Sequence, residues 1–90
     1  MTTPDRPRLF LVDDHPLVRA ALAQLLAGAG FAPDGQAGTP AEALAHPALA
    51  ASRLAVVDLA LGEESGFDLI RKLRARGLAV LVYSMHEGPN

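Results

Sequence analysis

Three short apolar runs, each followed directly by a polar residue, constrain the fold of this 90-residue chain more than any other feature. The runs cover residues 9–12, 54–57 and 78–83, and the polar residues that follow them are Asp13, Asp58 and Ser84. A run that is apolar at every position is typical of a strand buried on both faces, as in the middle of a parallel sheet.

Helical patterns separate these runs. Residues 16–27 carry leucine, valine and alanine at helical spacing, and Thr39-Pro40-Ala41-Glu42 is a capping box with proline at the first helical position. A third helix is predicted over 65–76, with Phe67, Ile70 and Leu73 facing inward, and a weaker strand over 31–36. The order β-α-β-α-β-α-β predicts right-handed crossovers and an α/β fold with a parallel sheet.

The composition of the chain excludes several classes of function. Apolar residues make up 50% of the chain, charged residues 20%, the net charge is −2 and there is no cysteine. These values exclude disulfides and thiolate metal sites, and they argue against electrostatic binding to nucleic acid or to an anionic membrane. Residues 1–7 are polar with two prolines, so we expect a disordered tail without a signal peptide. The expectation is a cytoplasmic chain that does not itself bind DNA or membranes.

The strand ends predict a cation site. In a parallel sheet Asp13, Asp14, Asp58 and Ser84 converge at the carboxyl edge, where ligands bind. Two carboxylates 4 Å apart repel by about 4 kcal/mol at an effective dielectric constant of 20. Three of them call for a cation, and their hard oxygen atoms favour Mg²⁺. Carboxylates around Mg²⁺ suit phosphoryl transfer, in which an aspartate acts as the nucleophile.

Three segments carry a resemblance to a known family. Leu-Val-Asp-Asp-His-Pro at 11–16, Val-Val-Asp-Leu at 56–59 with Ser-Gly-Phe-Asp-Leu at 65–69, and Leu-Val-Tyr-Ser-Met-His-Glu at 81–87 resemble a bacterial two-component response-regulator receiver domain of the NarL/FixJ type. The resemblance implies a flavodoxin-like (CheY-like) doubly wound sheet with strand order 2-1-3-4-5. It also implies a regulatory phospho-acceptor rather than an enzyme, a histidine kinase as partner and, in the family, a DNA-binding output.

The resemblance also implies residue roles. Asp58 is the phosphoacceptor, Asp14 binds Mg²⁺ directly and Asp13 binds it largely through water. The backbone carbonyl of Ala60, two residues after the acceptor, is a further metal ligand. Ser84 is the switch hydroxyl that turns toward the phosphoryl group.

The sequence departs from the family pattern in two places. Gly62 stands where the family usually has proline. The family continues through a fourth helix, a fifth strand with its site lysine, and a fifth helix, so residues 8–90 are expected to form the N-terminal three-quarters of a receiver, with strands 2-1-3-4 and without the fifth strand and last helices. Lys72, the single lysine, lies in the third helix and cannot replace the family lysine. The edge at 78–83 is then expected to be exposed and to promote self-association.

Two other interpretations are open. The first is a truncated, non-phosphorylated interaction fragment or a gene remnant. The second is a Mg²⁺-dependent phosphohydrolase of the haloacid-dehalogenase type; that family typically has a second aspartate where this chain has Ala60, which argues against this interpretation. His15, His46 and His86 are far apart in sequence and are predicted to be surface or loop residues rather than a ligand set.

Overall fold

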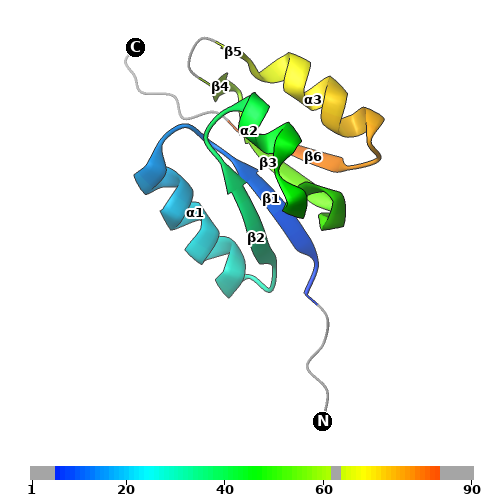
Figure 1. Cartoon of the computed structure of the whole chain (residues 1–90). Coiled ribbons are helices and arrows are strands. Elements are labelled where there is room, and N and C mark those ends of the chain that lie inside the picture. Colours follow the sequence, from blue (N-terminus) through cyan, green and yellow to red (C-terminus); the bar gives the residue numbers. More distant parts are fainter. Residues whose placement is uncertain (1–5, 62–63, 84–90) are drawn as a thin grey trace.

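The computed structural model describes residues 6–61 and 64–83 (Figure 1). Its elements are β1 (Arg8–Val12), α1 (Pro16–Gly28), β2 (Ala32–Ala37), α2 (Pro40–Ala45), the 3₁₀ helix η1 (Pro47–Ala51), β3 (Leu54–Asp58), β4 (Ala60–Leu61), β5 (Glu64–Ser65), α3 (Gly66–Ala75) and β6 (Ala79–Tyr83). In the described part of the chain, no helix is long and apolar enough to cross a membrane.

The main sheet is parallel and has four strands in the order β2-β1-β3-β6. This confirms the predicted α/β fold and its 2-1-3-4 strand order. The central strands β1 and β3 pair with Val12 beside Val57, and β3 and β6 pair with Asp58 beside Tyr83. The three strands therefore end at the same level, and the residues at their carboxyl ends share one edge of the sheet.

Alternate side chains of the central strands enter two separate cores. Leu9, Leu11 and Val56 face α1, where they contact Leu22 and Leu26. Helices α2, η1 and α3 cover the other face, as Figure 1 shows for α2 and α3. The core on that face is built by Phe10, Val12, Ala37, Ala43, Leu49, Ala55, Val57, Leu69, Leu73 and Leu78. Burial on both faces is the physical reason for the uninterrupted apolar runs of β1 and β3, whereas β6, at the edge of the sheet, is exposed or half-buried along its whole length.

The predicted capping box at the start of α2 is present, with one difference. Thr39 Oγ1 accepts a hydrogen bond from Glu42 N at 3.1 Å, as expected. Glu42 Oε1 accepts from Gly38 N at 2.9 Å, one residue before the cap. Glycine also follows two of the helices: Gly30 after α1 and Gly77 after α3 have positive φ angles of 100° and 89°.

Four details of the prediction need correction. Phe67 was expected to face inward but is 67% exposed, and the buried α3 residues are Gly66, Leu69 and Leu73. Strand β2 lies at Ala32–Ala37, one residue later than predicted, with a register irregularity opposite Leu9 and Phe10. Neither η1 nor the short antiparallel pair β4–β5 was predicted. Proline and glycine in β2 weaken the strand signal, and both are tolerated because β2 is an edge strand.

We expect Gly35→Ala to destabilise the fold by about 1–3 kcal/mol, because a Cβ atom at Gly35 would lie 2.4 Å from the Phe10 ring. Chemical denaturation would measure the change. Gly28→Ala is the matched control, since a Cβ atom there meets nothing within 4 Å and alanine favours the end of α1. An unfolding free energy unchanged by Gly35→Ala would contradict the close packing of β2 on Phe10.

Candidate functional site

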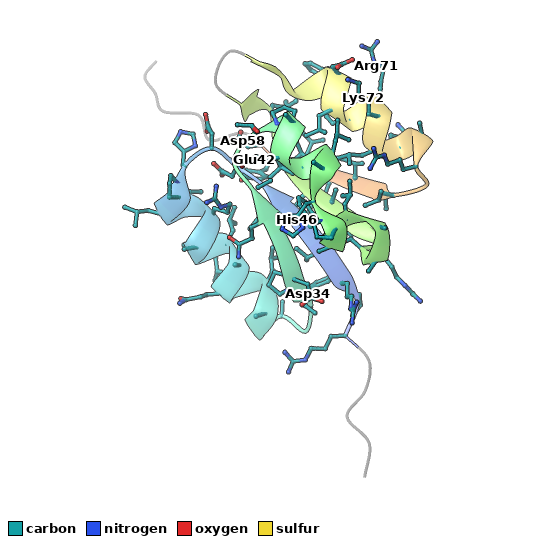
Figure 2. All side chains as sticks on the ribbon, viewed as in Figure 1. Asp34, Glu42, His46, Asp58, Arg71 and Lys72 are labelled. Carbon is teal, nitrogen blue, oxygen red and sulfur yellow. The ribbon has the colours of Figure 1, made fainter. Side chains whose placement is uncertain are left out.

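Three aspartates meet at the carboxyl edge of the sheet. Asp13 follows β1 and Asp58 ends β3, and both side chains are fully buried, whereas Asp14 is exposed. One ligand atom from each aspartate and from His15 all lie within 4.8 Å of one another. The structure thus brings Asp13, Asp14 and Asp58 together as predicted, and Figure 2 shows Asp58 at this end of the sheet. Ser84, expected at the same place, lies outside the described residues.

Backbone contacts fix the two buried aspartates. Asp13 N donates to Ala37 O at 3.0 Å, which ties the end of β1 to β2. Arg19 of α1 donates from Nη1 to the Asp13 carbonyl oxygen at 2.7 Å. After Asp58, Leu59 N donates to Tyr83 O at 2.9 Å. The site is therefore held by elements on both sides of β1 and β3.

Glycine is required where α3 begins. A Cβ atom at Gly66 would lie 2.9 Å from Leu59 O and 3.4 Å from Asp58 O. Any larger residue at this position would push the start of α3 away from the backbone that follows Asp58. The Ser-Gly-Phe-Asp-Leu segment therefore has a packing role beside the site. Ala60, predicted to offer its carbonyl to a metal, lies in β4 and pairs with Ser65.

His15 is an exposed loop residue, as predicted, but it also belongs to the acidic cluster, which the prediction did not include. Its side chain is 52% exposed, yet Nδ1 lies 2.8 Å from Asp13 Oδ1, 2.9 Å from Asp14 Oδ1 and 3.7 Å from Asp58 Oδ2. The hydrogen bond to Asp13, and next the charge of Asp14, raise the pKa of His15 above its usual value. The signal in the sequence was its position directly after two aspartates.

Two other ionisable residues noted in the sequence, His46 and Lys72, lie outside the acidic cluster. His46 Nδ1 accepts a hydrogen bond from Ala48 N at 3.0 Å and its ring meets Phe10 edge-on, so its role is structural. His86 lies outside the described residues. Lys72 Nζ lies 3.1 Å from Asp68 Oδ2 on the same helix, as expected for a residue in the middle of α3 (Figure 2).

Tyr83 is the site residue that sequence reasoning missed. Its hydroxyl donates a hydrogen bond to Asp13 Oδ2, from the strand beyond Asp58. Burial, followed by that hydrogen bond, raises the pKa of Tyr83 far above its usual value, so the hydroxyl remains a donor. Its position as the last residue of the third apolar run was the signal available in the sequence.

Comparison with known proteins identifies the class to which this fold and acidic edge belong. The family model described as the response regulator receiver domain matches residues 9–90. The chain therefore belongs to the response regulator receiver family.

The relatives are transcriptional regulators. The chain is 44% identical over 73 residues to the DNA-binding transcriptional activator DevR/DosR of Mycobacterium tuberculosis, which covers 77% of this chain and 32% of that protein. It is 36% identical over 83 residues to the transcriptional regulatory protein UhpA of Salmonella typhimurium, covering 88% of this chain and 40% of the relative. This chain thus spans two-fifths or less of the length of these relatives.

Solved structures agree with the assignment. A LuxR-family two-component response regulator from Aurantimonas sp. superposes with a TM-score of 0.80 at 30% identity, covering 93% of this chain and 62% of that one. The signal receiver domain of the response regulator NarL from Mycobacterium tuberculosis gives 0.76 at 27% identity, covering 96% of this chain and 72% of that one. These matches confirm the predicted CheY-like receiver fold and the NarL-type resemblance.

The raised pKa of His15 predicts a pH-dependent contribution to stability without divalent cations. A folded-state pKa above the unfolded value means that protonation favours the folded state. The contribution is complete below about pH 6.5, the unfolded value, and is lost as the pH rises through the folded-state pKa. With a chelator present, the difference in unfolding free energy between the unmodified chain and His15→Gln should therefore shrink as the pH rises.

Nuclear magnetic resonance provides the direct measurement, because the ring protons of His15 report its pKa. We expect a value above the ordinary one in chelator and a lower value in Mg²⁺, since the cation would compete with the imidazolium for the same carboxylates. An unshifted pKa in the chelated protein would show that His15 does not enter the cluster.

Proposed function

We propose that this chain accepts a phosphoryl group on Asp58 from a histidine kinase, with Mg²⁺ held by Asp13, Asp14, Asp58 and the backbone carbonyl of Ala60. The observation that carries the proposal is the gathering of three carboxylates within 4.8 Å at the carboxyl edge of the sheet. Membership of the receiver family supports it. We take residues 8–90 as the receiver unit and 1–7 as its tail.

The donor set fits a hard divalent cation. The three carboxylates offer oxygen ligands, and their mutual repulsion falls when a cation lies between them. When bound, Mg²⁺ supplies positive charge that offsets the charge on the transferring phosphoryl oxygens. Tyr83 and the His15 backbone amide keep the Asp13 carboxylate in place, through hydrogen bonds to Oδ2 and Oδ1 respectively.

In the proposed step, a carboxylate oxygen of Asp58 attacks the phosphorus of a phosphohistidine in the kinase. A new P–O bond forms as the P–N bond breaks, and the departing imidazole keeps the electron pair and takes up a proton. The product is an aspartyl phosphate. The fixed end of β3 holds the nucleophile in position, because Asp58 is fully buried and its backbone pairs with β6.

Ser84 is proposed as the hydroxyl that reports the modification. It follows Tyr83, whose strand pairs with the end of β3 at Asp58. The named functions of DevR/DosR and UhpA support a transcriptional output in a longer protein, with DNA contacted by a part of it other than these residues. A cytoplasmic location is proposed with that role.

Phosphorylation at Asp58 is directly testable. With Mg²⁺ and a small phosphodonor such as acetyl phosphate, intact-protein mass spectrometry should show one added phosphoryl group. Asp58→Asn should abolish the labelling, because an amide is not a nucleophile at this position.

Asp34→Asn is the matched control, since Asp34 is an exposed aspartate whose partner is Arg8, at 3.1 Å on the protein surface. It should label like the unmodified chain. Labelling that persists in folded Asp58→Asn would overturn the assignment of the acceptor.

Self-association of the 90-residue chain is a further proposal. Within residues 6–61 and 64–83, β6 pairs with β3 alone, and Leu81 and Val82 on opposite faces of β6 are 55% and 38% exposed. An exposed apolar edge strand is a template for pairing with another chain.

Sedimentation velocity should show concentration-dependent association that Leu81→Lys reduces. Phe67→Lys, at a site on α3 that is 67% exposed, should not reduce it, and a concentration-independent monomer would contradict the proposal.

A further inference from the structure

Asp13 is a carboxylate of the acidic cluster that hydrogen bonds hold in a fixed orientation. Its side chain is fully buried, and both of its oxygens accept hydrogen bonds. Oδ1 accepts from the His15 backbone amide at 2.7 Å, and Oδ2 accepts from the Tyr83 hydroxyl. The first bond is local, between residues two apart, whereas the second joins positions 70 residues apart.

The Tyr83 hydroxyl makes a hydrogen bond that the packing of the ring does not require. The ring lies against the buried cluster of Leu9, Leu11 and Val56, on the face of the sheet covered by α1. A phenylalanine would fill that space equally well. The hydroxyl adds one polar atom, and that atom reaches past the neighbouring strand to a single carboxylate oxygen.

We propose that Tyr83 is a positioning residue for the cation site, because its hydroxyl fixes the Asp13 carboxylate in the orientation that binds Mg²⁺. The proposal rests on the proposed function, in which Asp13 is a metal-site residue. A carboxylate has about four acceptor positions, and on Asp13 the Tyr83 hydroxyl, the His15 amide and the His15 ring occupy three of them. The fourth position, and the one that the ring gives up if a cation displaces it, are available for the ion or its water, so the Tyr83 hydroxyl supports binding rather than competing with it.

The same bond joins the metal site to the end of β6. Tyr83 directly precedes Ser84 in the sequence, and its carbonyl accepts from Leu59 N at 2.9 Å. A cation that holds Asp13 therefore also restrains the residue before the proposed switch hydroxyl. In the proposed function, the Ser84 hydroxyl responds to the phosphoryl group on Asp58. Tyr83 would instead respond to the cation, through its hydrogen bond to Asp13.

Mg²⁺ titration followed by backbone amide shifts tests the proposal without any phosphodonor. Tyr83→Phe keeps the ring and removes the hydroxyl, and it should weaken Mg²⁺ binding about 10-fold, as expected for losing a partner of a metal ligand. Ser52→Ala is the matched control, since it removes one hydroxyl that donates to Ala48 O at 2.9 Å on η1. The control should bind Mg²⁺ like the unmodified chain.

A second measurement needs no substitution of Tyr83. The chain contains one tyrosine and no tryptophan, so tyrosine emission reports on Tyr83 alone. A carboxylate that accepts from a tyrosine hydroxyl quenches its emission, and a cation on Asp13 should relieve this quenching. We expect emission to rise with Mg²⁺ at the midpoint seen in the amide shifts, and not to respond in Asp13→Asn.

The outcomes separate this proposal from the one on which it rests. Equal Mg²⁺ affinity in folded Tyr83→Phe and in the unmodified chain would overturn the role of Tyr83 while leaving the metal site intact. Emission that stays flat while Mg²⁺ saturates the amide shifts would do the same. An unmodified chain that binds no Mg²⁺ would overturn both the metal site and the role of Tyr83.

Discussion

Electrostatic repulsion at one edge of the sheet is the constraint on which the rest of the structure depends. The parallel pairing of β1 with β3 places Asp13 and Asp58 side by side, both fully buried, with Asp14 next to them. Such a cluster opposes folding unless positive charge and hydrogen-bond donors surround it. The His15 ring, the Tyr83 hydroxyl and backbone amides supply part of this compensation. The apolar cores on both faces of the strands supply the stability that holds the carboxylates together.

Much of this arrangement is predictable from the sequence because it follows from strand direction alone. An apolar run that ends in aspartate identifies both a buried strand and the end at which its polar residue lies. Once helices separate the runs, the strands must be parallel and their ends must share an edge. Asp13, Asp14 and Asp58 could therefore be grouped across about half the chain without knowledge of side-chain geometry. The cap at Thr39 is local chemistry and was predictable for that reason.

The remaining features depend on tertiary contacts, which the spacing of apolar residues along the sequence does not predict. Whether Tyr83 reaches Asp13 depends on the register of two strand pairs and on one rotamer. The His15 ring lies in the cluster because of the turn into α1, whereas the apolar pattern over residues 16–27 predicts only the helix that follows. Phe67 was misplaced because it stands in the first turn of α3, where one apolar residue does not define which face is inward. Strand β2 depends on Gly35 accommodating the Phe10 ring, a tertiary contact.

The long reach of the bond between Tyr83 and Asp13 has a consequence for how the site is assembled. The unit formed by β1, α1 and β2 consists of near neighbours in the chain, whereas the pocket also needs β3 and β6. Closing longer loops carries a greater entropic cost, so contacts of this separation form slowly relative to local ones. A chain folded only through β2 presents Asp13 and Asp14 without Asp58 or Tyr83. The proposed cation binding would therefore favour the completed sheet over partly folded chains, since only the completed sheet presents all three carboxylates.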